Sequence, residues 1–293
     1  MEGARLKMEL KDNEFLLDSS QINELYAKGE INSPSSYKEN TFLVASDGIK
    51  NEVPVIYQDG KLKKIDRNLM FMGIEPRNNE QLACMNMLKD DSISTVAITG
   101  LARSGKSLFA TDYGLHAVQT GEYDKLILTR PNIELGDSMG FLPGEKDQKF
   151  KPYLQPVYDC AESLGDRSMI DDMISKGMID AIPIPYMKGR NFKNSIIIVD
   201  EAEDLTIEVL QILGTRLDKG SKIIFTGDIK QVDNRKVKGN MSPFQYMIKK
   251  FKHSRLTSHI HFTENQGSPI VNLFYYDLDR DDFKHGKYVG DEI

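Results

Sequence analysis

The sequence predicts an α/β fold, with a mainly parallel β-sheet covered by helices on both faces and preceded by a small β-rich appendage. From residue 75 onward, short and entirely apolar segments such as 195–199 alternate with segments of helical periodicity. Strands of this kind are buried on both faces, as in a parallel sheet with crossover helices. Residues 1–74 differ, because turn signals separate their short strand candidates.

The appendage is assigned to residues 1–74 and the main domain to residues 75–293. A helix is expected around 20–28, followed by the turn-rich segment NSPSS and by strand candidates at 41–46 and 52–65 that Asp-Gly turns interrupt. A unit of about 70 residues has a small core and limited stability of its own. Its role cannot be deduced from the sequence.

The main domain contains strands and helices in alternation. The apolar residues of its first helix, Leu82, Met85 and Leu88, have helical spacing. Strands are expected at 94–99, 125–129, 194–200, 221–228 and 259–262. Helices are expected at 79–90, 105–121, 149–164, 168–176, 207–217 and 243–252. This order of elements is typical of crossover connections in a parallel sheet.

Composition is that of a globular protein that is not embedded in a membrane. The 293 residues are 40% hydrophobic and 28% charged, with a net charge of −6. No apolar run approaches the roughly 20 residues that span a bilayer, and the charged opening lacks a signal peptide core, so a cytoplasmic protein without a membrane partner is expected. Two cysteines, Cys84 and Cys160, predict buried or idle thiols, with neither a disulfide framework nor zinc.

The segment GLARSGKS, residues 100–107, matches the phosphate-loop pattern G-x-x-x-x-G-K-[ST] between a strand and a helix. Its glycines let backbone N–H groups face phosphate oxygens, Lys106 reaches the β and γ phosphates, and Ser107 gives an oxygen to Mg²⁺. The alternative is a glycine-rich turn that binds nothing. The predicted nucleotide-binding residues are Gly100, Leu101, Ala102, Arg103, Ser104, Gly105, Lys106, Ser107 and Leu108.

An acidic pair, Asp200 and Glu201, follows the apolar strand 194–200. Magnesium held by a phosphate loop needs a second anchor, which is an acid at the end of a neighbouring buried strand, and Asp200 fills that place. Glu201 is placed to polarise a water that attacks the γ phosphate. The alternative is that the pair only caps the next helix.

A third set of polar residues lies at the tip of the next predicted strand and consists of Thr226, Asp228 and Gln231. The Gln231 amide could hydrogen-bond the γ phosphate and report its presence. A solvated turn is the alternative. With the two preceding motifs, the order along the chain favours a hydrolase whose conformation follows its nucleotide.

These residues together resemble the PhoH family of P-loop ATPases from about Arg77 to Ile260. The resemblance rests on PRNNEQ, the phosphate loop, the block from LTRPNIELGDSMGFLPG to PYLQPVYD, and the segments IPIPYMKGRNF, IIIVDEAE and GTRLDKGSKIIFTGDIKQVD. The stretches LDSSQINELYAKGEI and ENTFLV also resemble the segment that joins nuclease and ATPase in PIN–PhoH fusion proteins. No segment resembles the PIN nuclease, so nuclease activity is not expected.

The resemblance implies a RecA-like core related to superfamily 1 helicases, ATP hydrolysis with Mg²⁺, a ring-shaped homo-oligomer such as a hexamer, and RNA unwinding as in the PIN fusions. It implies that Gln81 reads adenine and that Gln231 senses the γ phosphate. Since the chain has room for one RecA-like lobe, Arg216 or Arg190 is expected to act on a neighbouring subunit's nucleotide. Arg130 and Lys188 fall in matching motifs without an assigned role.

The chain departs from the family pattern at several positions. Leu101, Arg103 and Ser104 replace the usual proline, glycine and threonine of the loop, and Glu203 replaces a glutamine. Gly267 stands where the family carries an arginine, which puts efficient hydrolysis in doubt.

Charge is uneven along the chain. Residues 219–255 hold ten Lys or Arg and two Asp, a balance of +8 that leaves −14 for the rest. Single-stranded RNA is the first candidate partner and DNA the second, although a solvated helix face also explains the KKFK run. The loop cations expected to contact a strand are Lys146, Lys149, Lys230, Arg235, Lys236 and Lys238.

Two other functions remain open. A P-loop kinase for a small molecule is disfavoured by Glu201 and Gln231, because a kinase needs no carboxylate that activates water. A slow ATP-dependent switch or scaffold without unwinding activity is favoured by Gly267. Turnover stimulated by nucleic acid would separate a helicase from a scaffold.

Overall fold

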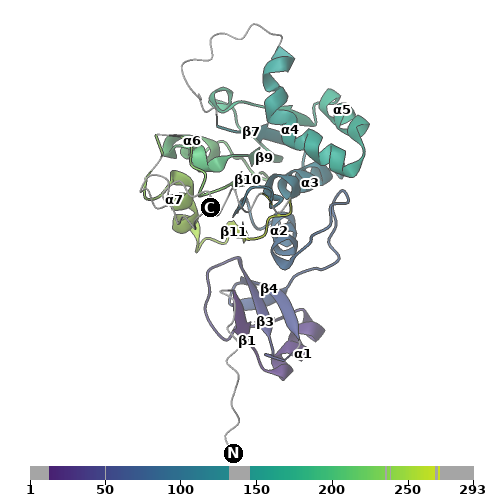
Figure 1. Cartoon of the computed structure of the whole chain (residues 1–293), viewed down its shortest axis with the longest axis vertical. Helices are drawn as coiled ribbons and strands as arrows, with labels where there is room; N and C mark the ends of the chain where they lie inside the picture. Colours follow the sequence, from purple (N-terminus) through teal and green to yellow (C-terminus); the bar gives the residue numbers. More distant parts are fainter. Residues whose placement is uncertain are drawn as a thin grey trace, which may run out of the picture.

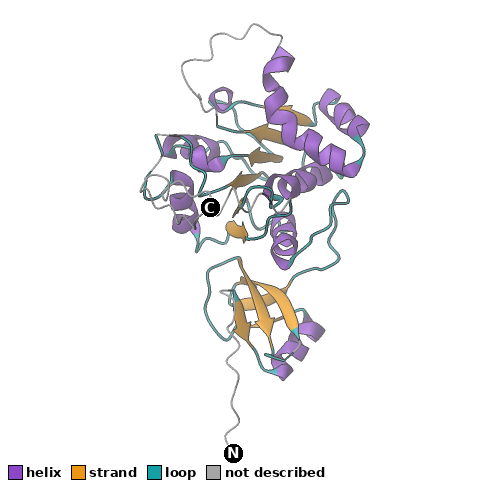
Figure 2. Cartoon of the chain, in the orientation of Figure 1, coloured by secondary structure: helices purple, strands orange, loops and turns teal. Residues whose placement is uncertain are grey.

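The computed structural model describes residues 13–49, 51–131, 146–234, 236–237, 239–267 and 270, and for 146–151 the backbone alone. Two sheets are present, a smaller one in the N-terminal part and a larger one surrounded by helices (Figures 1 and 2). The predicted α/β fold with a β-rich N-terminal appendage is confirmed.

The larger sheet has six strands, all parallel, in the order β11-β6-β10-β9-β7-β8. Five of the strands fall where the apolar segments predict them. The sixth, β8, has three residues and was not predicted from the sequence. The strands are β6 (Thr95–Gly100), β7 (Lys125–Thr129), β8 (Ile179–Ala181), β9 (Ser195–Val199), β10 (Lys222–Gly227) and β11 (Thr257–Phe262).

Helices cover both faces of this sheet, because alternate residues of each buried strand point in opposite directions. Ile196 and Ile198 pack with helices α2 to α5 in one cluster, while Ile197 and Val199 pack with α6 and α7 in another. Figure 1 shows the two groups on opposite sides of the strands. The helices are α2 (Asn79–Lys89), α3 (Lys106–Gln119), α4 (Lys146–Leu164), α5 (Arg167–Ser175), α6 (Ile207–Gly214) and α7 (Pro243–Phe251).

The helix boundaries follow local capping signals. Asn78 and Ser242 accept hydrogen bonds from backbone N–H groups in the first turns of α2 and α7. Helix α6 is shorter than the predicted 207–217, because it ends at Gly214 and Leu217 forms an isolated bridge with Phe192. Both cysteines are free and buried, as predicted.

The smaller sheet has the order β1-β3-β4-β5-β2 and is flanked by α1 (Ser19–Lys28). The helix begins at a capping box of Asp18 and Gln21. The sequence did not predict β1 and β2, which have three residues each and depend on their partner strands. The strands are β1 (Glu14–Leu16), β2 (Glu30–Asn32), β3 (Thr41–Ser46), β4 (Glu52–Gln58) and β5 (Lys61–Lys64).

The appendage is joined to the larger part by both apolar and polar contacts. Phe42, Val44 and Ile56 belong to the same buried cluster as α2 and α3. The Asn40 side chain is 2% exposed and donates hydrogen bonds to the carbonyl oxygens of Arg255 at 3.0 Å and Thr257 at 2.8 Å. The appendage therefore docks on the segment that leads into β11.

Among the described residues, no helix combines the length and the apolarity that crossing a membrane requires.

We expect Asn40→Ala to lower the free energy of unfolding by about 3 kcal/mol, because two hydrogen bonds from a buried side chain are lost and alanine takes over a left-handed backbone with φ of 56°. Urea unfolding of the full chain would measure this. Asn32→Ala, at an exposed strand position, is the control and should change stability by less than about 0.5 kcal/mol. Equal losses in the two variants would contradict the docking role of Asn40.

Candidate nucleotide site

The carboxyl edge of the six-stranded sheet gathers the predicted motifs. Since all six strands are parallel, the segments that follow β6, β7, β9, β10 and β11 leave from the same edge. These segments contain the phosphate loop, Arg130, the pair Asp200 and Glu201, the turn 228–231, and residues 263–267.

The phosphate loop turns sharply between β6 and α3. Gly100 has φ of 145°, and a Cβ there would collide with the Phe262 carbonyl oxygen of β11. Gly105, with φ of 97°, precedes α3 and leaves its first N–H groups without a side-chain cap. Those N–H groups and the helix dipole form an anion site at the start of α3.

Lys106 is held inside its own loop. Its ammonium group donates hydrogen bonds to the carbonyl oxygens of Gly100 at 2.9 Å and Leu101 at 2.7 Å. Burial lowers the Lys106 pKa, and the nearby carboxylates of Asp228, Glu203 and Asp200 oppose that shift. Lys106 must leave these carbonyl groups to reach a phosphate.

Ser107 and Asp200 bring two strand tips together. The Ser107 hydroxyl donates to Asp200 Oδ1 at 2.8 Å, and the Thr226 hydroxyl donates to the same oxygen. The expectation that Asp200 ends a strand neighbouring the loop strand was wrong, because β10 lies between β6 and β9 and contributes Thr226.

The oxygen atoms of Ser107 and Asp200 are also suitable ligands for Mg²⁺. Hydroxyl and carboxylate oxygens are ligands that Mg²⁺ prefers, and it commonly takes one or two protein ligands together with substrate phosphates. Among the described residues no group of three or more His, Cys, Asp or Glu could hold a metal ion. Ser107 and Asp200 would therefore hold the ion together with the phosphates, whose charge it would neutralise.

Glu201 follows Asp200 in a left-handed conformation with φ of 55° and ψ of 41°. Such backbone strain in a non-glycine residue is concentrated at functional sites. Burial raises the Glu201 pKa, and the Arg130 guanidinium, 3.7 Å from Glu201 Oε1, opposes this shift. The side chain remains 46% exposed, so water can reach it.

Glu203 is the buried acid of this segment. Its residue is 7% exposed, and its Oε2 has no hydrogen-bond partner among the described residues. Burial raises the Glu203 pKa to about 8, although the N–H groups of Glu203 and Asp228 partly offset the effect. Gly227 is needed beside it, because a Cβ there would collide with the Glu203 carboxyl group. A protonated Glu203 has nearly the shape of the glutamine in the family pattern and, like it, carries no charge and offers both a donor and an acceptor, with one donor hydrogen in place of two.

Asp204 is a positioning residue that the sequence did not reveal. Its Oδ1 accepts hydrogen bonds from the backbone N–H groups of Asp233 at 2.8 Å and Asn234 at 2.7 Å. It therefore ties the segment after β9 to the loop after β10. Gln231 lies in that loop and is exposed, with its N–H donating to the Asp228 carbonyl oxygen.

Gln81, the residue predicted to read adenine, is hydrogen-bonded to the phosphate loop. Gln81 is 2% exposed, its Oε1 accepts from the Arg77 N–H at 2.7 Å, and its Nε2 donates to the Ser104 carbonyl oxygen at 3.1 Å. These bonds occupy the amide oxygen and one amide hydrogen, and the adenine contact of Gln81 stays a prediction.

Arg190 and Arg216 do not join this site. Both lie in segments that precede β9 and β10, at the amino edge of the sheet. Arg190 is exposed above the Phe192 ring at 5.6 Å, whereas Arg216 is half-buried and its Nε has no hydrogen-bond partner among the described residues. Action in a neighbouring subunit's site stays a prediction for both residues.

Gly267 lies against the phosphate loop. A Cβ at Gly267 would be 2.9 Å from Arg103 Cδ, and the Gln266 N–H donates to the Arg103 carbonyl oxygen at 3.0 Å. Arg103 has φ of 58°, its side chain is exposed, and no carboxylate of the described residues pairs with it. Arg103, which departs from the family's loop pattern, therefore lies next to Gly267, the position at which the family pattern has an arginine.

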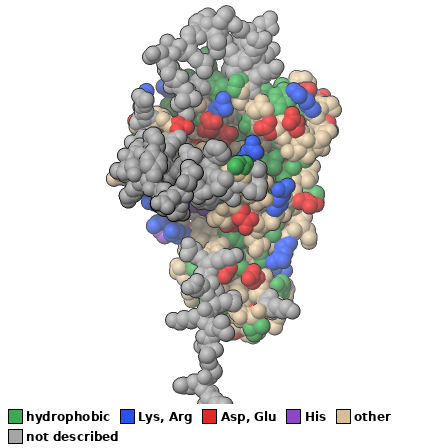
Figure 3. Space-filling view, in the orientation of Figure 1, with side chains coloured by type: hydrophobic (Ala, Val, Ile, Leu, Met, Phe, Trp, Pro, Cys, Tyr) green, Lys and Arg blue, Asp and Glu red, His purple; other side chains and the backbone are tan. Residues whose placement is uncertain are grey.

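The predicted nucleic-acid cations are not all described. Lys230 and Lys236 are exposed, while Arg235, Lys238 and the side chains of Lys146 and Lys149 lie outside the described residues. On the face shown in Figure 3, the coloured acidic and basic side chains are interspersed, without a continuous basic stripe.

The parallel sheet, the loop at its carboxyl edge and the contact between Ser107 and Asp200 are those of a P-loop NTPase fold. The family model for PhoH-like proteins matches residues 73–269. The chain belongs to the PhoH-like family, as the motif resemblance predicted.

Curated relatives cover much of the chain. PhoH2 of Mycolicibacterium smegmatis is 30% identical over 256 residues, which is 86% of this chain and 58% of the relative. A PhoH-like protein of Synechocystis is 43% identical over 134 residues, 46% of this chain and 41% of the relative. The chain thus spans about three fifths of the length of the first relatives it matches.

Among solved structures, the large terminase of a thermophilic bacteriophage aligns at a TM-score of 0.48 and 15% identity, covering 70% of this chain and 51% of the terminase.

We expect Glu203→Gln to become more stable than the wild type as pH rises. The native Glu203 pKa is raised, so the stability linked to its proton is fully present below pH 4.5 and is lost as pH rises through about 8. Glutamine does not titrate, so its advantage should reach a few kcal/mol by pH 9. Urea unfolding at pH 5, 7 and 9 would measure it.

Glu24→Gln, on the exposed face of α1, is the matched control and should keep the wild-type pH dependence. A Glu203→Gln curve parallel to the wild type from pH 5 to 9 would show that Glu203 is ionised throughout.

Proposed function

We propose that this protein binds ATP with Mg²⁺ and hydrolyses it, and that hydrolysis is coupled to the binding and unwinding of single-stranded RNA or DNA by a homo-oligomeric ring. The observation that carries the first part is the 2.8 Å contact between Ser107 and Asp200. It joins the phosphate loop to the acid that a bound nucleotide's metal ion requires.

The chemical step follows from the same edge of the sheet. The oxygen of a water molecule attacks the γ phosphorus, the bond to the β-phosphate oxygen breaks, and ADP and inorganic phosphate result. Glu201 takes the proton that the attacking water loses and later releases it to solvent. Lys106 and the loop N–H groups stabilise the charge on the phosphate oxygens.

The resemblance to the ATPase part of PIN–PhoH fusion proteins and the exposed loop cations Lys230 and Lys236 support nucleic acid as the partner. Because Arg190 and Arg216 lie at the amino edge, either could act only on the nucleotide of another subunit, and the proposed ring provides that arrangement. RNA remains the first choice over DNA.

We expect Lys106→Ala to abolish phosphate release above background and Glu201→Gln to lower it by about 10²- to 10⁴-fold while retaining ATP binding. Phosphate release and nucleotide titration would be measured with and without single-stranded RNA or DNA, with strand separation followed in parallel. Wild-type turnover equal to that of Lys106→Ala would contradict the proposal.

A second function is a slow ATP-dependent switch. The contacts that hold Lys106 on its own loop and Glu201 beside Arg130 favour it, since both groups must exchange a partner within the chain before they can act on a nucleotide. Turnover that does not respond to any nucleic acid, together with tight ATP binding, would support the switch over the helicase.

We propose that Arg103 supplies the positive charge that the family pattern carries at position 267, where this chain has glycine. Its left-handed backbone costs about 1 kcal/mol relative to glycine, and its guanidinium group is exposed beside Gly267. A strained arginine in a phosphate loop, with no carboxylate of the described residues beside it, is explained by a contact with phosphate oxygens.

We therefore expect opposite effects from Arg103→Gly. Without nucleotide the variant should be more stable by about 1 kcal/mol, because glycine adopts the left-handed backbone freely. Its affinity for ATP should fall about tenfold and its affinity for AMP much less, because the lost contact is with the phosphate chain. Thermal unfolding with and without each nucleotide would measure both effects.

The double variant Arg103→Gly with Gly267→Arg should recover most of the ATP affinity, since it returns the charge to the family position. An Arg103→Gly protein with unchanged ATP affinity would exclude a phosphate contact by Arg103.

A further inference from the structure

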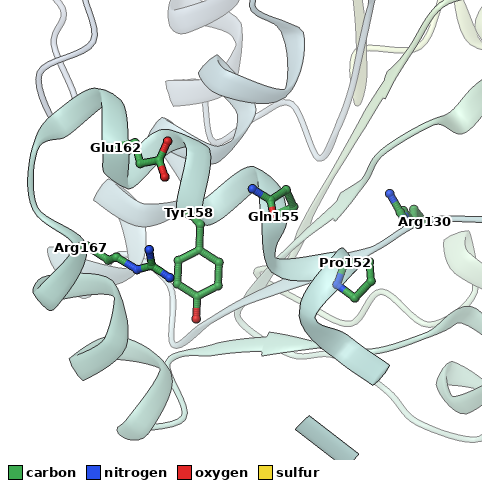
Figure 4. A pocket seen from close by; sticks show the side chains of 6 residues that line it. All are labelled: Arg130, Pro152, Gln155, Tyr158, Glu162 and Arg167. Atoms are coloured by element: carbon green, nitrogen blue, oxygen red, sulfur yellow. The ribbon is translucent and has the colours of Figure 1, made fainter. Parts of the chain in front are cut away.

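A pocket of about 570 Å³ opens beside the nucleotide site, in the size range of ligand sites. One face of α4 forms its floor, because Pro152, Gln155, Tyr158 and Glu162 follow helical spacing. Figure 4 shows Arg130, from the end of β7, at one end of this row and Arg167, the first residue of α5, at the other.

The far end of the pocket offers a stacking surface. The Arg167 guanidinium lies over the Tyr158 ring, 4.9 Å from its centroid, and Tyr158 is half-buried. An arginine stacked on an aromatic ring is a surface on which nucleic-acid bases stack, and the arginine can also contact phosphate.

Hydrogen-bonding groups lie between the two arginines. The Gln155 amide can donate and accept, and the Pro152 carbonyl lacks its helical donor because Pro156 has no N–H. The Glu162 carboxylate makes a polyanion without bases a poor ligand, but it can accept hydrogen bonds from base amino groups. A ligand that combines bases with spaced phosphates suits this mixture of groups.

Arg130 connects the pocket to the chemistry. It lines the pocket, lies over the Tyr153 ring at 5.6 Å, and is 3.7 Å from Glu201 Oε1. Its side chain is 36% exposed, so an incoming phosphate can reach it. A phosphate that binds the guanidinium competes with Glu201 for the same donors.

We propose that this pocket binds a segment of single-stranded nucleic acid and that its phosphate draws Arg130 away from Glu201, which releases Glu201 to activate water. The coupling half of this inference rests on the proposed ATP hydrolysis. The binding half does not. An acidic peptide is the competing ligand class, and the stacking pair of Tyr158 and Arg167 favours a base.

Binding is tested with a fluorescein-labelled oligo-uridine, and in parallel oligo-thymidine, by anisotropy at low and moderate salt. Arg167→Gln should weaken binding about tenfold and reduce the salt dependence by about one phosphate contact. Tyr158→Ala should weaken it as well, and Tyr158→Phe should restore it, because phenylalanine keeps the ring. Lys176→Gln, at the other end of α5, is the control and should bind as the wild type does.

Coupling is tested by phosphate release from the same proteins. Arg167→Gln should keep the activity measured without oligonucleotide and lose its stimulation at oligonucleotide concentrations that saturate the wild type. Arg130→Gln should show raised activity without oligonucleotide and no further stimulation, because Glu201 is already free.

The outcomes separate the two proposals. Weaker oligonucleotide binding by Arg167→Gln in a protein that hydrolyses no ATP would sustain the pocket and overturn the proposed function. Wild-type binding by both Arg167→Gln and Tyr158→Ala would overturn the pocket, as would equal competition by poly-glutamate. Loss of binding only in the double variant Lys249→Gln with Lys250→Gln would also overturn the pocket, because it would place the oligonucleotide on α7.

Discussion

The hydrogen bond from the Ser107 hydroxyl to the Asp200 carboxylate is the constraint on which the architecture of this site depends. It requires the start of α3 to lie over the tip of β9, two strands away from the strand that leads into the loop. Helix α3 can pack this closely on the sheet because Gly114 faces the sheet, where a Cβ would be 2.8 Å from Leu126 Cδ1. A glycine inside a helix costs about 1 kcal/mol relative to alanine, and here it permits the close packing of α3 against β7.

Charge at this edge is balanced around one lysine. Asp200, Asp228 and Glu203 all act on Lys106, whose own burial disfavours the ammonium form. Three ionised carboxylates around one ammonium group would repel an arriving triphosphate. The raised pKa of Glu203 keeps this carboxyl group mainly neutral at pH 7, so it resembles the glutamine of related proteins in charge as well as in shape. The substitution at position 203 is therefore smaller electrostatically than the sequence suggests.

Sequence patterns located the long strands and the phosphate loop, because buried strands are apolar throughout and the loop needs its glycines and lysine. They did not locate β1, β2 and β8, since three residues carry too little periodicity. They placed Asp200 on a neighbouring strand, because a pattern along the chain contains no information about the order of strands in the sheet. The sequence could not predict the contact between Arg103 and Gly267 either. These two positions, which both differ from the family pattern, come together only because β11 lies beside β6. The tie from Asp204 to residues 233 and 234 depends on the same kind of tertiary proximity.

Strand β11 connects the appendage to the phosphate loop. Its entry accepts the Asn40 hydrogen bonds at Arg255 and Thr257, and its last residue, Phe262, fills the space beside Gly100. Beyond it, the Thr263 N–H and hydroxyl both bond the Glu80 carboxylate at the start of α2. Because β11 pairs with β6 along all six residues, it cannot shift without moving either Phe262 against Gly100 or Asn40 away from its acceptors. The position of the appendage and the width of the loop are thus linked through one short strand, and the tight fit at Gly100 makes that link stiff.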